Sequence, residues 1–238
     1  IGPGVDNVVK PDLVHYGGNN DTHMQLLSEY GVQYLRWSGT SFSTPRITSL
    51  AANLQQRIGG DCNPLLLKAL LVHNSDYPCE VNESKECLRK EMGFGIPSAV
   101  TNMLKDDADE CTMVFKQTLE KGKDIASLDF PYPECLKKNG KFIGKIKLTM
   151  VTNPIINASQ GCEYCQSQVD VLLETFDQVI HVNLGEGIMR NADRTSDDAV
   201  NVLNPNLYSK KSFKPEMAEE RMLIEQGDKY QPIKKYVI

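Results

Sequence analysis

The stretch Gly39-Thr40-Ser41-Phe42-Ser43-Thr44-Pro45, followed by an amphipathic run from Arg46 to Arg57, constrains this 238-residue chain more than any other. Four apolar residues of the run recur at i, i+3, i+4 and i+7, the spacing of one helix face: Ile47, Leu50, Ala51 and Leu54. Pro45 is expected in the first helical turn, where a missing backbone N–H costs nothing. The pattern predicts a helix that buries one face and begins beside a serine hydroxyl.

Ser41 is therefore expected at a helix N-terminus, where free N–H groups and the helix dipole favour negative charge. A serine in that position suits acyl transfer, because its oxygen can attack a carbonyl carbon while a nearby N–H stabilises the oxyanion. Gly39 is expected to let another segment pass close to the serine. The structural alternative is that Ser41 caps the helix, the commonest role of serine there.

Four segments, in order, resemble the subtilisin-like serine proteases, the subtilases, over roughly residues 1–104. The stretch from Gly39 to Pro45 is similar to the nucleophile signature of that family. The other three resemble its upstream strand and glycine turn, its next buried helix and its Gly-aromatic-Gly turn: Lys10–Val14 with Gly17-Gly18, Leu65–His73, and Gly93–Ile96.

The resemblance implies that Ser41 is the nucleophile of an Asp-His-Ser triad and that Gly39, Thr40 and Pro45 support it. It also implies that Trp37 and Phe42 lie at the substrate cleft, although ordinary packing explains Trp37 equally well.

The triad order Asp, His, Ser requires two partners upstream of the serine, and only forty residues precede Ser41. We therefore expect the Asp, the His and the oxyanion-hole asparagine in a missing N-terminal half of the catalytic domain, and no activity from this chain alone. His15, His23 and His73 do not match the catalytic histidine of the family. His73 ends an apolar helix and is expected to be a packed or capping residue.

Local patterns predict five elements in the first part. They are a strand from Val8 to Val14, a loop from Asn19 to Tyr34, a helix from Pro64 to His73 capped by Asn63, a surface loop or hairpin from Asp76 to Met92, and a helix from Pro97 to Leu104.

The charged run Asp106–Glu110 indicates a linker, and alternating apolar residues after it predict strands. The expected strands are Thr112–Leu119, Lys123–Phe130, Phe142–Val151, Val169–Phe176 and one in the last eight residues. The sequence thus predicts an α/β subtilisin-like fragment, the C-terminal half of the catalytic domain, at 1–104. A mostly antiparallel β-sandwich or jelly-roll-like domain is expected at 105–238, with a long polar loop at Asn183–Phe213 and a short helix at Pro215–Gln226.

Seven irregularly spaced cysteines favour a reducing compartment, and so slightly favour the cytoplasm, over a disulfide framework. The pair Cys162 and Cys165 is a lone C-x-x-C, for which zinc and redox roles lack the required context; free thiols or a local disulfide is the default interpretation. No cofactor is predicted. Calcium would suit the parent protein, but the cluster of Asp193, Asp197 and Asp198 lacks regular ligand spacing.

The net charge of −5 argues against nucleic acid or an anionic membrane as a main partner. The expected partners are a peptide or protein substrate and the missing half of the catalytic domain. Two other functions stay open: a non-catalytic protein- or glycan-binding module on a subtilase scaffold, and acyl transfer to an amine in place of water.

Overall fold

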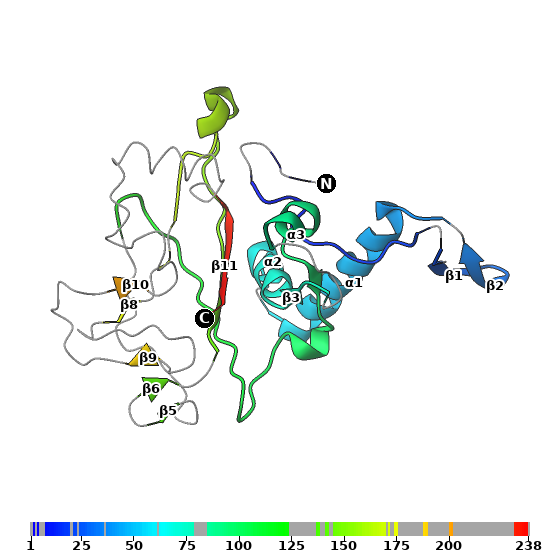
Figure 1. Cartoon of the computed structure of the whole chain (residues 1–238), viewed down its shortest axis with the longest axis horizontal. Coiled ribbons are helices and arrows are strands. Elements are labelled where there is room, and N and C mark those ends of the chain that lie inside the picture. The colour runs from blue at the N-terminus through cyan, green and yellow to red at the C-terminus, as the bar shows by residue number, and fades with distance from the viewer. Residues whose placement is uncertain are drawn as a thin grey trace.

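The computed structural model describes residues 2, 4, 8–19, 21–22, 24–35, 37–60, 62–78, 85–123, 137–138, 141–142, 145–169, 171, 174–175, 188–189, 200–201 and 231–237. The labelled helices α1 (Thr40–Ile58), α2 (Pro64–His73) and α3 (Lys85–Met92) gather on one side, and α1 extends outward to a hairpin (Figure 1). No helix in the described ranges is both long and apolar enough to cross a membrane.

The predicted apolar face of α1 is confirmed. Leu54 is completely buried, and it clusters with Leu70 and Leu71 of α2 and with Met103. The other three predicted face residues pack against this cluster: Ile47, Leu50 and Ala51. The apolar residues of α1 and α2 therefore hold the two helices together.

The predicted position of Pro45 is wrong, because α1 begins at Thr40 and Pro45 falls inside the helix. Proline has no backbone N–H, so it cannot donate to the carbonyl four residues earlier, which is that of Ser41. The first two turns of α1 therefore lack the backbone hydrogen bond from residue 45 to Ser41 O.

Helix α2 has the predicted bounds and the predicted cap. The Asn63 side chain accepts a 2.8 Å hydrogen bond from the Leu66 N–H, and Pro64 is the first helical residue. Leu70, Leu71 and Val72 are buried, as an apolar helix requires.

Two predictions for the first forty residues are wrong. Residues 8–14 form no strand, because Pro11 has no backbone N–H to donate to a neighbouring strand. The segment is held instead by bonds such as the one from Phe94 N–H to Asp12 O, at 3.0 Å. The loop expected at 19–34 contains an antiparallel hairpin of β1 (Met24–Ser28) and β2 (Gly31–Leu35). Its sequence signal is weak because apolar side chains such as Leu27 point outward and break the alternation.

The Gly-aromatic-Gly turn is confirmed: Gly93 and Gly95 have φ of 61° and 96°, and Phe94 is buried. The neighbouring predictions need correction. The described end of the expected loop at 76–92 is α3, and the helix expected at 97–104 is only the single 3-10 turn η2 (Val100–Asn102). Pro97 instead pairs in β4 (Ile96–Pro97) with β3 (Ser75–Asp76).

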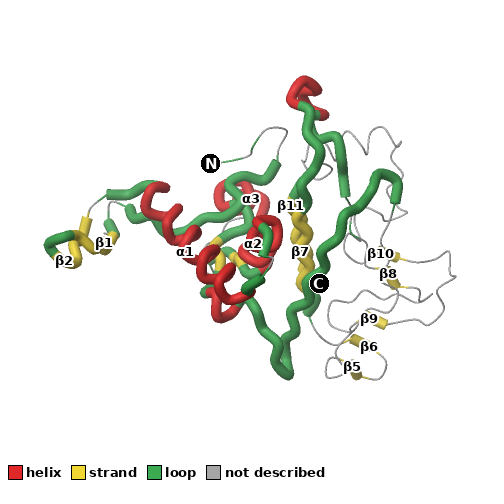
Figure 2. The backbone as a smooth tube through the Cα atoms, turned by 180° about the vertical axis from the view of Figure 1, so that it is seen from behind, coloured by secondary structure: helices red, strands yellow, loops and turns green. Residues whose placement is uncertain are grey.

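Beyond residue 105 the described strands form small separate antiparallel sheets. The longest pair joins β7 (Lys147–Val151) to β11 (Ile233–Val237), and the two lie side by side in Figure 2. The remaining strands are β5 (Lys137–Lys138), β6 (Lys141–Phe142) and β9 (Ile188–Met189) in one sheet, and β8 (Glu174–Thr175) with β10 (Val200–Asn201) in another. The described strands form no sandwich or jelly roll, so only the antiparallel pairing of that prediction is seen.

The strand expected at Thr112–Leu119 is wrong, since these residues lie outside any strand and leave Val114 and Phe115 exposed. The linker expected at 106–110 is a tight turn, in which the Asp107 carboxylate accepts from two following N–H groups. The predicted helix at 215–226, nearly all of the strand at 123–130 and most of the loop at 183–213 lie outside the described residues.

A second core cluster joins the two parts of the chain. Val9, Val72 and Phe94 pack with Ile233 of β11, and Val151 of β7 covers them. The helix-rich part and the β7–β11 pair therefore share buried residues, while the domain boundary at 104 stays a prediction.

Candidate functional site

Ser41 is the second residue of α1 and is exposed. Gly39 takes the N-cap position with an extended backbone and no side-chain cap, so Ser41 is not the capping residue of α1. The Phe42 N–H donates to Gly39 O at 3.0 Å. Among the described residues, neither the Ser41 hydroxyl nor its backbone N–H has a hydrogen-bond partner. As far as the described residues go, the hydroxyl and the N–H of one residue are thus both available to a reacting carbonyl.

The glycine pair at 17–18 fixes the entry to this helix. The Gly39 N–H donates to Gly17 O at 3.1 Å, and a Cβ at position 17 would lie 2.7 Å from Gly39 O. Gly18 has a φ of +84°, and a Cβ there would lie 2.7 Å from Trp37 O. The close approach expected at Gly39 is therefore made by its backbone against Gly17; a Cβ on Gly39 would meet only Ser41 N, at 3.9 Å.

A hollow of about 350 Å³ lies between β1 and the first turns of α1. Its lining residues are Met24, Gln25, Leu26, Ser41, Phe42, Pro45, Arg46 and Ser49. On a helix of 3.6 residues per turn, the lining positions of α1 lie opposite its core face. The helix therefore buries one side and turns the Ser41 side toward the hollow.

The structure brings Ser41, Phe42 and Pro45 to this hollow, together with Arg46, the one charged residue of the lining. Phe42 is half-buried there. Trp37 does not line the hollow, and its side chain is 72 % exposed, so it is not packed against the described residues. A role for Trp37 at a substrate cleft remains a prediction.

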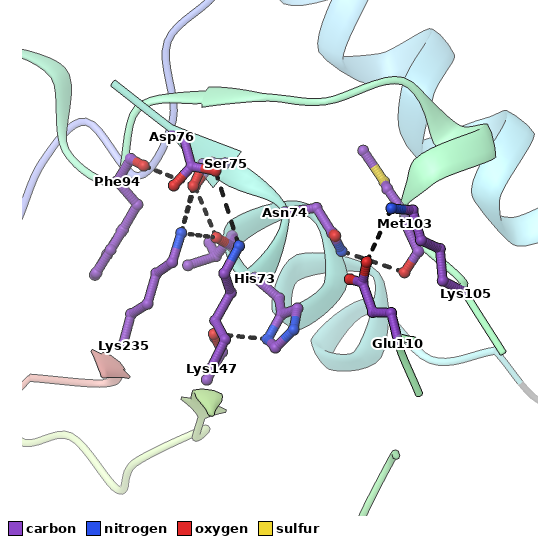
Figure 3. A network of polar contacts seen from close by, with 12 residues as sticks. His73, Asn74, Ser75, Asp76, Phe94, Met103, Lys105, Glu110, Lys147 and Lys235 are labelled. Carbon is purple, nitrogen blue, oxygen red and sulfur yellow. Dashed lines mark hydrogen bonds and ion pairs between the residues drawn. The ribbon is translucent and has the colours of Figure 1, made fainter. Parts of the chain in front are cut away.

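His73 is a packed histidine, as predicted. Its Nδ1 lies 3.1 Å from Thr149 Oγ1 of β7 (Figure 3). Burial of the ring, together with the charges of Lys147 and Lys235, lowers the pKa of His73 to about 4. The half-buried His15 has a buried Nδ1 without a hydrogen-bond partner, and His23 lies outside the described residues. Within the described part of the chain, no histidine hydrogen-bonds Ser41.

Sequence reasoning missed a polar cluster at the C-terminal end of α2. Ser75 is completely buried, and its Oγ lies 2.7 Å from the carbonyl oxygens of Val72 and Phe94. The Lys235 amine of β11 donates to Val72 O at 2.9 Å and to Ser75 O (Figure 3). Burial lowers the pKa of Lys235 to about 8. A Lys-Lys pair in a sequence usually indicates a solvated surface, so the buried contact of Lys235 could not be predicted from the sequence.

Cys62, Cys87, Cys111 and Cys165 are free thiols, and the Cys165 thiol donates to Ser167 O at 3.3 Å. The side chain of Cys162 and the cluster of Asp193, Asp197 and Asp198 lie outside the described part. Within that part, no three His, Cys, Asp or Glu side chains gather closely enough to hold a metal ion.

Comparison with protein families matches residues 1–102 to the Subtilase family. No curated protein and no solved structure matches the chain. The matched range contains the Ser41 signature, the glycine pair, α2 and the Gly93–Gly95 turn. The first 102 residues of this chain are therefore similar to the Subtilase family, the subtilisin-like serine proteases.

Proposed function

We propose that the chain is part of a subtilisin-like serine endopeptidase in which Ser41 is the nucleophile. The observation that carries this proposal is the exposed Ser41 at the start of α1, whose hydroxyl and N–H both lack partners among the described residues. The subtilase match over residues 1–102 supports the assignment.

In this reaction, Ser41 Oγ attacks the carbonyl carbon of the scissile peptide bond and passes its proton to a histidine base. The carbonyl oxygen becomes an oxyanion, which the Ser41 N–H stabilises together with the dipole of α1. The histidine then gives the proton to the leaving amine, and water hydrolyses the acyl-enzyme. Gly39 and Thr40 set the start of the helix, and Phe42 contributes an apolar wall beside the nucleophile.

The base and its aspartate are proposed to come from another part of the catalytic domain. Two observations support this: the His73 ring is engaged by Thr149, and no described histidine hydrogen-bonds Ser41. The chain alone is therefore proposed to be inactive. In subtilisin, loss of the triad serine or histidine costs about six orders of magnitude in turnover. That other part of the domain is a proposed partner, and a peptide or protein is the proposed substrate.

The remaining proposals concern the setting of the enzyme. The four free thiols fit a reducing compartment, and the net charge of −5 fits partners other than nucleic acid or anionic membrane. We assign no cofactor. A β-sandwich-like domain after residue 105 remains a proposal that the antiparallel pairs support only in part.

The test is labelling with a fluorophosphonate probe, which reacts with activated serines. We would label this chain alone, the chain extended to a complete catalytic domain, and the extended Ser41→Ala and Ser43→Ala variants. Ser43 is the matched control, because it lies on the same helix and its hydroxyl donates to Thr40 O.

The proposal expects labelling of the extended protein and of its Ser43→Ala variant only. If the folded extended protein does not label, or if the Ser41→Ala variant still labels, Ser41 is not the nucleophile. Peptide products that are joined, not hydrolysed, would instead identify a transferase.

A further inference from the structure

We infer that residues 231–237 act as a latch, a segment that completes the packing of residues 1–102. Residues 1–102, which match the subtilase family, are called the subtilase segment here. The latch comprises Gln231 and Pro232 with the strand β11, Ile233–Val237. It contacts residues 8–14 and the C-terminal end of α2, both of which lie within the family match at 1–102. This inference does not depend on the proposed peptidase activity.

Three latch residues contact the subtilase segment. Side chains two positions apart point to the same side of a strand, so Ile233 and Lys235 share one side of β11, and Gln231 lies just before the strand. Each makes a different kind of contact with the subtilase segment: a hydrogen bond, an apolar insertion and a cationic cap.

The hydrogen bond joins the two ends of the chain. Gln231 Oε1 accepts from the Val9 N–H at 3.1 Å, and the bond is buried. A buried N–H without an acceptor costs the full desolvation of that group. The Gln231 amide therefore satisfies a donor in a segment that has no strand partner of its own.

The apolar insertion is made by Ile233, which is 2 % exposed. It packs with Val9, Val72 and Phe94, three residues from three separate places in the subtilase segment. Leu13 packs against this cluster and also against the cluster that holds α1, so the two cores are in contact through one side chain.

The cationic cap is made by Lys235. Its amine donates to Val72 O and Ser75 O and lies 3.4 Å from Ser75 Oγ (Figure 3). Carbonyls at a helix C-terminus lack intrahelical donors and carry the negative end of the dipole, so a cation stabilises them. Strand β7 holds the latch from its other side through five residue pairs and the bond from Thr152 N–H to Pro232 O, 2.8 Å.

The test is amide hydrogen exchange, followed by NMR, on the full chain and two variants. Lys235→Met removes the cap and keeps a side chain of similar length. Lys145→Met removes the same charge from an exposed residue just before β7 and is the matched control. The readouts are the amides of Asn74, beside the cap, and of Val9 and Val14, at the other end of the latch.

The latch predicts that Lys235→Met accelerates exchange at all three amides by roughly tenfold or more, the scale of a lost charge-assisted hydrogen bond. Lys145→Met should leave the three rates unchanged. If Lys235→Met leaves Val9 and Val14 at their wild-type rates, the strand is a peripheral addition and the inference is overturned.

A wild-type measurement covers the case in which the variant does not fold. In a denaturant series under native conditions, the amides of residues 8–14, of Asn74 and of β11 should open at one shared free energy. Opening of β11 at a lower free energy, with residues 8–14 still protected, would overturn the latch.

Discussion

The lowered pKa of His73 predicts a specific dependence of stability on pH. The unfolded chain binds a proton at this imidazole near pH 6.5, whereas the folded chain binds it only near pH 4. Between these values the unfolded state carries more protons, so the free energy of unfolding should rise with pH. Stability from this group is complete above pH 6.5 and is lost as the pH falls toward 4.

The size of the effect follows from the shift and from the exposure of the ring. A shift of that size corresponds to about 3 kcal/mol if the site were fully shielded from solvent. His73 is only half-buried, so solvent screening reduces the expected loss to about 1–2 kcal/mol. Urea unfolding at several pH values between 4 and 7.5 would measure it, provided that the transition is two-state.

The variant His73→Gln separates this group from the carboxylates that also titrate in acid. Glutamine can still hydrogen-bond Thr149, but it does not titrate. As the pH falls from 6.5 to 4, the free energy of unfolding of His73→Gln should therefore fall less than that of the wild type. Lys147→Met should show an intermediate fall, because the Lys147 charge contributes to the lowered pKa. Parallel curves for the wild type and His73→Gln would refute the reasoning.

Two further predictions concern stability near neutral pH, and both use urea or thermal unfolding. An alanine in the left-handed region costs about 1–2 kcal/mol of stability. Gly93→Ala should cost more than that, because its Cβ would lie 1.8 Å from Pro11 O. Gly59→Ala, with a φ of +66° and open space around it, should cost only that amount, and equal costs would contradict the clash. Asn63→Ala should cost about 1 kcal/mol by removing the cap on the Leu66 N–H, and an unchanged stability would contradict that role.

Elements with local signals were predictable from the sequence. The spacing of apolar residues predicts helices α1 and α2, and Asn63 and Pro64 mark the start of α2. Gly18, Gly93 and Gly95 have a positive φ, a conformation that few other residues adopt. The family resemblance rests on these same local features, and the family match over residues 1–102 agrees with it.

Other elements were misread for identifiable reasons. Helix α3 contains strong helix formers, but its many charges and single buried leucine, Leu88, resemble a surface loop. The β1–β2 hairpin carries apolar residues on its exposed face, which hides the alternation of a half-buried strand. The contact between Lys235 and the end of α2 joins residues about 160 positions apart, and no local pattern encodes such a contact.

The core around residues 1–102 extends beyond the range that the family match covers. The match ends at residue 102, yet Val9, Val72 and Phe94 are covered by Ile233, and the Val72 carbonyl of α2 accepts from Lys235. Without β11, these apolar side chains would meet water and the Val72 carbonyl would lose a cationic donor. The unit that folds around α2 therefore includes residues from both ends of the chain. Because Leu13 contacts both clusters, the packing that supports the helix of Ser41 adjoins the packing that the latch completes.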